Sequence, residues 1–278
     1  MKFKIVADSA ADIPVVKGVP FESVPLKIVT DVKEYVDDSA LDVAGMVADL
    51  LKYKGKSGTA CPGPGEWLAA FEDAEYVFCV TITSNLSGSY NAACVAKDQY
   101  EQENPGRKVY IVDSLSAGAE MYMIVEKLEE LILAGKEFDE ICTEIAAYTN
   151  NVHLVFCLES LQNLANNGRV NPAVAKIAGV LGIRQVGIAS EIGTLQPLDK
   201  SRGEKKAIAD VVKNIKAQGW AGGRVLIHHC QNEAVAQQVK AQLLQVHPNA
   251  DVRLGKTNGL CSYYAEKGGL MIGFETAK

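Results

Sequence analysis

Small hydroxyl residues and glycine gather in one stretch of the chain, Thr81–Ala93, which reads TITSNLSGSYNAA. An apolar run ends there, and Ser87-Gly88-Ser89 begins a helical pattern. The first turn of a helix offers unpaired N–H groups and a partial positive charge, which suit a carboxylate or a phosphate. The same residues are also typical of a plain helix cap, supplied by Asn85 or Ser87. The stretch therefore indicates either an anion site or a cap.

Polar residues also follow three of the predicted strands, which end in Asp8-Ser9, Thr83-Ser84 and Asp113-Ser114. Because the carboxyl ends of parallel strands meet at one edge of a sheet, ligands in such folds bind outside that edge. We therefore expect Asp8, Ser9 and Ser84 to lie at the edge of a pocket.

Ser57–Trp67 (SGTACPGPGEW) contains two prolines and three glycines, which predicts a loop where backbone can approach a ligand closely. It is not a phosphate-binding P-loop, because Leu50 stands where the first glycine before Gly55-Lys56-Ser57 is required. On these residues alone an ordinary connection is the favoured interpretation.

Arg169 in NNGRV and Arg202 in KSRGEKK each stand in a predicted turn that contains glycine. A guanidinium held in a rigid turn suits bidentate phosphate binding. The alternative is a solvated charged face.

Motifs of catalysis are absent from the sequence. It has no GxSxG, HExxH, Walker or GxGxxG pattern, and its four histidines lack metal-ligand spacing. The seven cysteines form no CxxC pair, which favours buried thiols in a reducing compartment. We expect no metal, no catalytic residue and no enzymatic activity of the chain by itself.

Strands and helices alternate along the first half of the chain, which predicts a mostly parallel sheet with helices on both faces. The second half predicts an α+β arrangement. Expected strands cover residues 4–7, 24–29, 76–83, 108–112, 152–158, 184–189, 193–198, 224–229 and 251–254, with a final apolar segment at 270–274. Expected helices cover residues 41–54, 87–102, 117–134, 138–150, 172–181, 204–218 and 233–246.

A length of 278 residues favours two domains, which we expect at residues 1–150 and 151–278. The net charge of −6 disfavours nucleic acid or an acidic membrane as a partner. The apolar runs are too short for a membrane span, and MKFKIVADSAAD does not resemble a signal peptide. We therefore expect a cytoplasmic protein.

Six segments in order along nearly the whole chain resemble the DegV family of bacterial fatty-acid-binding proteins. They are VADSAADIP, Thr59-Ala60-Cys61-Pro62 (Thr-Ser-Gln-Pro in the family), the segment 83–90 (Ser-Ser-x-Leu-Ser-Gly-Thr-Tyr), Val-Asp-Ser at 112–114, LQNLANNGRV, and Arg202-Gly203.

The resemblance implies an α/β fold of two domains with one long-chain fatty acid buried between them. It also implies a non-catalytic role in phospholipid metabolism, in which the chain presents the fatty acid to a separate fatty acid kinase subunit and needs no cofactor. By resemblance, Thr59, Ser87 and Gly88 hold the carboxylate, whereas Arg169 and Arg202 engage the kinase subunit or the phosphate.

Two residues depart from the family pattern. Ala60 replaces a serine at the pocket edge, and Tyr264 replaces the histidine of a C-terminal His-Thr-Gly-Pro-Gly motif. A tyrosine can still hydrogen-bond the carboxylate but carries no positive charge at neutral pH, so we expect fatty acid binding and weaker phosphorylation. Two other functions stay open, a lipid-sensing regulatory protein and a stand-alone acyl hydrolase or transferase.

Overall fold

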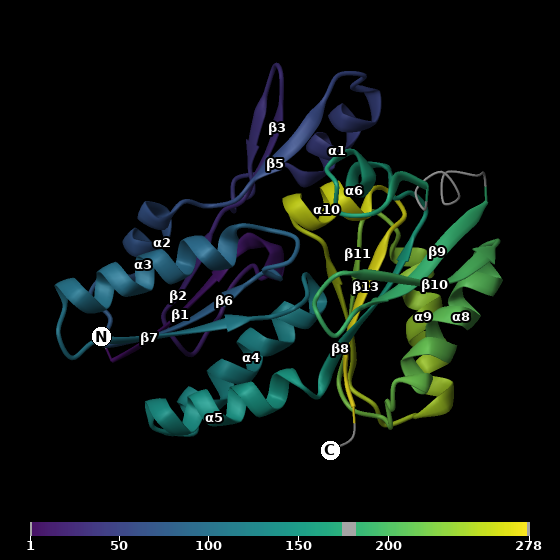
Figure 1. Cartoon of the computed structure of the whole chain (residues 1–278). Helices are drawn as coiled ribbons and strands as arrows, with labels where there is room; N and C mark the ends of the chain where they lie inside the picture. The colour runs from purple at the N-terminus through teal and green to yellow at the C-terminus, as the bar shows by residue number, and fades with distance from the viewer. Residues whose placement is uncertain (1, 174–181, 277–278) are drawn as a thin grey trace.

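A computed structural model describes residues 2–173 and 182–276 of the chain. Within these residues the chain forms two large β-sheets and one small sheet, with helices between and outside them (Figure 1). No helix in this part of the chain is both long and apolar enough to cross a membrane.

The first large sheet is parallel, with strand order β2-β1-β6-β7. Parallel sheets are covered on both faces, which explains why β1 and β6 are apolar runs. Helices α2 and α3 pack on one face, and α4 and α5 pack on the other. The bounds are β1 Phe3–Asp8, β2 Phe21–Val24, β6 Tyr76–Thr81, β7 Lys108–Asp113, α2 Pro64–Phe71, α3 Ser89–Glu103, α4 Ala119–Leu133 and α5 Phe138–Thr149.

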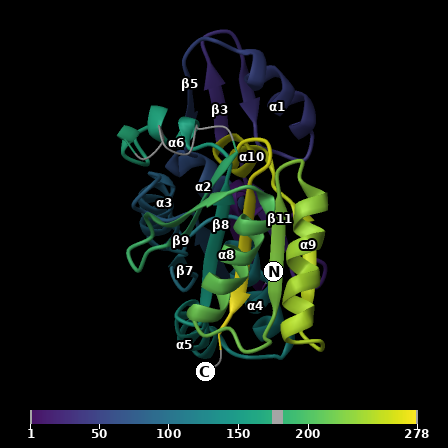
Figure 2. The same ribbon diagram turned by 90° about the vertical axis from the view of Figure 1, so that its right-hand side faces the viewer.

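The second large sheet is mostly antiparallel, with strand order β10-β9-β8-β13-β11-β12. Only β11 and β12 pair in parallel among its described strands. Figure 2 shows α8 and α9 in front of this sheet, and their buried side chains form a core with its outer face. The bounds are β8 Val152–Leu158, β9 Ile183–Ala189, β10 Leu195–Arg202, β11 Val225–His229, β12 Val252–Lys256, β13 Leu270–Glu275, α8 Glu204–Ala217 and α9 Glu233–Val246.

A small antiparallel sheet, β4-β3-β5, projects beyond the two large ones beside α1 (Figure 1). The short helices α6 and α10 pack against each other below it. The bounds are β3 Lys27–Thr30, β4 Glu34–Val36, β5 Ser57–Ala60, α1 Val43–Lys52, α6 Gln162–Asn166 and α10 Gly259–Ala265, and a 3-10 turn, η1, covers Ser9–Ala11.

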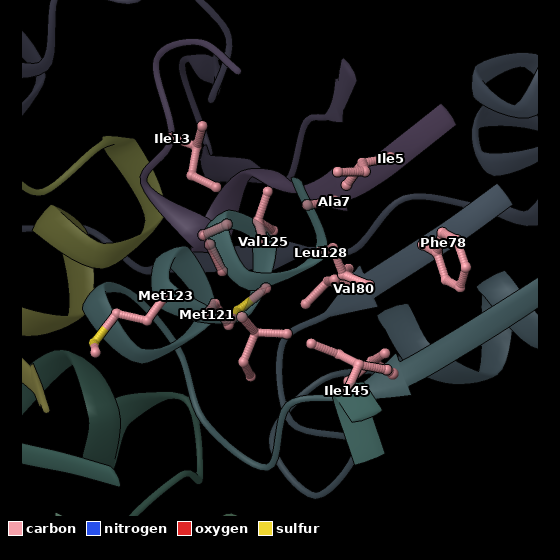
Figure 3. Close-up of a cluster of buried hydrophobic side chains, with 14 of the residues drawn as sticks. Ile5, Ala7, Ile13, Phe78, Val80, Met121, Met123, Val125, Leu128 and Ile145 are labelled. Atoms are coloured by element: carbon pink, nitrogen blue, oxygen red, sulfur yellow. The ribbon is translucent and has the colours of Figure 1, made fainter. Parts of the chain in front are cut away.

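Helix α4 lies between the two large sheets and contacts β1 and β6 on one side and β8, β11 and β13 on the other. Figure 3 shows Met121, Val125 and Leu128 of α4 packed among side chains of the first sheet, such as Ala7 and Val80. A helix that packs on two sides must be apolar around most of its circumference, as α4 is. Helix α4 therefore packs against both large sheets and joins the two halves of the molecule.

The fold class predicted from the sequence is confirmed, and most elements begin and end within a few residues of their expected bounds. The boundary between domains at residue 150 falls between α5 and β8 and stays a prediction. The helix expected over residues 172–181 lies mainly on residues 174–181, outside the described residues.

Two expectations were wrong. The single strand over 24–29 is two strands in different sheets, because Pro25 ends β2 and the chain turns before β3. The expected loop Ser57–Trp67 contains β5 and the start of α2. That helix begins with Pro64 at its first position, and the Glu66 carboxylate accepts a hydrogen bond from the Gly63 N–H at 2.8 Å.

Candidate functional site

A cavity of about 350 Å³ lies where the loops after β6 and β7 face strands β8 and β13 of the second sheet. Residues from both halves of the chain line it, and most of its wall is aliphatic or aromatic. The apolar wall includes Leu26, Ile82, Leu86, Leu115, Leu154, Phe156, Leu158, Leu164, Leu195, Leu260 and Met271. Such a wall favours a hydrocarbon chain, because binding removes the chain from water and so lowers the free energy. It offers few hydrogen-bond partners to a polar ligand.

Thr59 and Tyr264 form a polar pair in this wall. The register of β5 against β3 places Thr59 opposite Ile28, and its hydroxyl lies 2.7 Å from the Tyr264 hydroxyl on α10. Burial raises the pKa of Tyr264, and the Thr59 hydrogen bond and the Arg169 charge oppose that rise. The phenol is therefore neutral at pH 7 and can donate a hydrogen bond. When two hydroxyl groups form one hydrogen bond, only one of their two hydrogens is used, so the second hydrogen can be donated to a ligand.

Ser87 and Gly88 line the cavity where the loop after β6 enters α3. Gly88 is the N-cap residue, and the Ser87 hydroxyl accepts a hydrogen bond from the Ser89 N–H at 3.3 Å, so the positive end of a 15-residue helix begins beside the cavity. A Cβ atom at position 88 would lie 3.2 Å from the Cys61 sulfur, so glycine lets this loop approach the chain segment that follows Thr59.

Arg169 connects these two polar regions. Its Nε donates to the Leu86 carbonyl oxygen at 3.1 Å, and its guanidinium carbon lies 5.9 Å from the centre of the Tyr264 ring. Hydroxyls, helix N–H groups and a guanidinium thus meet in one part of an otherwise apolar cavity. This combination suits an amphipathic ligand with a carboxylate at one end.

A family model described as "Uncharacterised protein, DegV family" matches residues 2–277. The chain belongs to the DegV family. It is 40% identical to a DegV domain-containing protein of Streptococcus pyogenes serotype M1, and the match covers 99% of this chain and 100% of that protein.

Solved DegV structures share the fold over their full length. A DegV family protein from Eubacterium eligens loaded with heptadecanoic acid is 45% identical, with a TM-score of 0.97 over 99% of this chain and 100% of that one. The Streptococcus pneumoniae fatty acid kinase B3 protein loaded with linoleic acid is 41% identical, with a TM-score of 0.97 over 100% of both chains.

The predicted pocket-edge residues of this DegV chain occupy different places. Ala60 lines the cavity, but Asp8, Ser9 and Ser84 do not. The fully buried Asp8 carboxylate accepts hydrogen bonds from the Ile82 N–H at 2.9 Å and the Ser89 hydroxyl at 2.7 Å. Asp8 therefore fixes both ends of the 82–89 segment from behind the cavity. Burial raises the pKa of Asp8 to about 7, although these hydrogen bonds oppose the rise.

Ser9 and Ser84 are held by the loops around them. The Ser9 hydroxyl accepts a hydrogen bond from the Leu26 N–H at 3.0 Å, and the Ser84 N–H donates to the Asp113 carboxylate at 3.1 Å. Both residues shape the cavity's surroundings without facing it.

The two predicted phosphate or kinase arginines are in different environments. Arg169 lines the cavity, where its Nε donates to the Leu86 carbonyl and its Nη1 donates to the Asn167 carbonyl at 2.5 Å. Arg202 ends β10, is exposed, and is absent from the cavity wall.

Helix α10 was not predicted, although it carries Tyr264. Seven residues are too few for a clear helical period, and the helix is fixed by a partner remote in sequence. The Asp37 carboxylate accepts hydrogen bonds from the Gly259 N–H at 2.6 Å and the Leu260 N–H at 2.9 Å, which caps the helix. In the chain outside residues 1, 174–181 and 277–278, no cluster of three His, Cys, Asp or Glu could hold a metal ion.

Proposed function

We propose that this chain binds one long-chain fatty acid and presents its carboxylate to a separate fatty acid kinase subunit. Thr59, Ser87, Gly88 and Tyr264 would hold the carboxylate, and the acyl chain would fill the apolar cavity between the two domains. The observation that carries the proposal is this cavity, in which a long apolar wall ends at hydroxyl groups and a helix N-terminus.

The acyl chain would supply most of the affinity. Burial of about fourteen methylenes contributes roughly 11 kcal/mol at about 0.8 kcal/mol each, from which the costs of association and ordering must be subtracted. The headgroup then needs only hydrogen bonds for orientation, which a neutral threonine–tyrosine pair can give. The relatives loaded with heptadecanoic acid and linoleic acid support this class of ligand.

The partner in the proposal is the kinase subunit that would transfer phosphate from ATP to the bound carboxylate. The name of the Streptococcus pneumoniae relative, a fatty acid kinase B3 protein, supports this assignment. The exposed Arg202 would contact that subunit, and Arg169 would contact the phosphate from the cavity wall. The chain would act in the cytoplasm, without a cofactor of its own and without catalysing the transfer.

The experiment combines the purified chain, oleic acid, ATP with Mg²⁺ and the catalytic subunit of a bacterial fatty acid kinase, and traps acyl phosphate with hydroxylamine. We expect product only when both proteins are present. Equal product without this chain would contradict its role as the presenting subunit. A parallel assay of Tyr264→His measures whether a histidine at this position increases the rate, as expected if charge matters in the transfer.

A further inference from the structure

Asp37 holds the start of α10 from the end of the small sheet. The residue follows β4 directly, is 3% exposed, and its own N–H donates to the Leu26 carbonyl at 2.9 Å. Its carboxylate accepts hydrogen bonds from the Gly259 and Leu260 N–H groups, and a Cβ atom at position 259 would lie 2.6 Å from Asp37 Oδ1. Glycine at this position therefore lets α10 approach the carboxylate closely. Burial raises the pKa of Asp37 to about 6, and these hydrogen bonds oppose the rise, so the group is mostly ionised at pH 7.

Asp12 holds the same segment from the first large sheet. It follows η1, is 2% exposed, and has a φ of 56°, a conformation that aspartate and asparagine adopt more readily than most side chains. One carboxylate oxygen accepts a hydrogen bond from the Asn258 N–H at 2.7 Å, and the other lies 3.1 Å from Nδ1 of the buried His228 on β11. Two buried carboxylates thus hold three consecutive N–H groups, at positions 258–260.

Neither carboxylate lines the cavity, yet α10 carries Tyr264 into the cavity wall. A helix of seven residues is not stable by itself in water, so its position depends on such tertiary contacts. Asp37 also joins α10 to the sheet that carries Thr59, because β4 pairs with β3 and β3 pairs with β5. This carboxylate therefore fixes the two members of the Thr59–Tyr264 pair relative to each other.

We propose that Asp12 and Asp37 are positioning residues for headgroup recognition, which hold the Tyr264 hydroxyl where it meets both the Thr59 hydroxyl and the ligand carboxylate. The inference rests on the proposed fatty acid binding, and neither residue would touch the ligand. Loss of either carboxylate leaves buried N–H groups without acceptors. The start of α10 would then shift and the Tyr264 hydroxyl would lose its alignment, whereas most of the apolar wall belongs to other elements.

The test measures dissociation constants for stearic acid and its methyl ester, and their ratio gives the preference for a free carboxylate. Asp37→Ala should reduce this preference about fivefold, the effect of losing one hydrogen bond to a charged group, and should change the ester affinity much less. Asp12→Ala should reduce it several-fold. Asp37→Asn keeps one acceptor oxygen and should give an intermediate preference. Cooperative thermal unfolding of each variant confirms that it is folded.

Two further variants separate positioning from a general loss of stability. If Asp37 acts through Tyr264, Asp37→Ala should leave the preference unchanged in a Tyr264→Phe background, because the hydroxyl that it positions is already absent. Asp12→Asn is the conservative replacement, since an amide can accept from the Asn258 N–H, donate to Nδ1 of a neutral His228 and adopt a positive φ. It should retain the preference of the unmodified chain.

Asp210→Asn is the matched control for the loss of a buried carboxylate. Asp210 is 2% exposed and accepts hydrogen bonds from the Ser201 hydroxyl and from Lys206 Nζ, each at 2.6 Å. It lies on α8, which contributes no residue to the described cavity wall. The variant should therefore leave the preference unchanged, even where it lowers the unfolding temperature.

An unchanged preference in folded Asp37→Asn and Asp12→Ala would overturn the inference. Equal reductions by Asp37→Ala with and without the Tyr264 hydroxyl would do the same, as would a comparable loss in Asp210→Asn. Failure of the unmodified chain to bind stearic acid, or to prefer it over the ester, would instead contradict the proposed function, so the two failures are distinguishable.

Discussion

Removal of one hydroxyl, in Tyr264→Phe, tests the carboxylate site most selectively. The ring and its packing stay, and only the phenol that lies 2.7 Å from the Thr59 hydroxyl is lost. A hydrogen bond to a charged group contributes about 1.5 kcal/mol or somewhat less here, since Thr59 can rotate to replace part of it. We therefore expect a loss of about 1 kcal/mol, or a roughly fivefold rise in the dissociation constant.

The matched control is Tyr263→Phe, which removes the neighbouring hydroxyl. That hydroxyl lies 2.8 Å from the Ser57 hydroxyl and accepts from the Asn167 side chain at 2.9 Å, and the residue does not line the cavity. Its loss should lower the free energy of unfolding by about 1 kcal/mol and leave fatty acid affinity within about twofold.

Isothermal titration calorimetry with stearic acid and its methyl ester completes this test. Tyr264→Phe should weaken the acid several-fold and the ester much less, because the ester presents no charged acceptor. If Tyr264→Phe binds both ligands like the unmodified chain, or if Tyr263→Phe weakens the acid as strongly, the carboxylate does not lie at the Thr59–Tyr264 pair.

Three further predictions concern other parts of the account. Thr59→Ala combined with Ser87→Ala should weaken fatty acid binding by about 2–3 kcal/mol in calorimetry, at roughly 1–1.5 kcal/mol per hydrogen bond to a charged group; unchanged affinity in a folded double variant would remove these residues from the site. Arg169→Ala and Arg202→Ala should each keep lipid affinity within about tenfold, because the acyl chain supplies most of the binding energy. Each should reduce acyl phosphate formation. Loss of lipid binding in both variants would contradict the proposal that these arginines serve the kinase subunit or the phosphate. Since the folded-state pKa of Glu120 is raised from 4.5 to about 8, its contribution to stability is fully present below pH 4.5 and is lost as the pH rises through 8. The free energy of unfolding of Glu120→Gln, relative to that of the unmodified chain, should therefore rise between pH 5 and pH 9, by up to roughly 5 kcal/mol. An equal difference between the two proteins at pH 5 and at pH 9 in urea unfolding would refute the raised pKa.

The long elements of the fold could be predicted from the sequence, because their hydrophobic pattern is local to each element. The apolar runs of β1, β6 and β8 and the long amphipathic helices follow from periodicity alone. The small sheet could not be predicted in this way, because β3, β4 and β5 have only three or four residues each, and β5 pairs with β3 across the intervening helix α1. Their alternation is too short to stand out, and their partners are set by tertiary packing.

The site was partly predictable for a similar reason. Thr59, Ser87 and Gly88 stand in segments whose composition marks loops or a helix start, and the family resemblance selected them among many such residues. Asp8, Ser9 and Ser84 do not line the cavity, because the end of a strand fixes where a residue lies and does not fix which group its side chain contacts.

Mass spectrometry of the chain purified from cells, first intact under native conditions and then after organic extraction, measures whether the chain carries a fatty acid. We expect one long-chain fatty acid per chain, released on denaturation. It should be lost from a variant in which Thr59 and Ser87 are alanine and Phe156 in the cavity wall is replaced by a charged residue. A chain that carries no lipid, and that takes up none when incubated with stearic or oleic acid, would contradict the account.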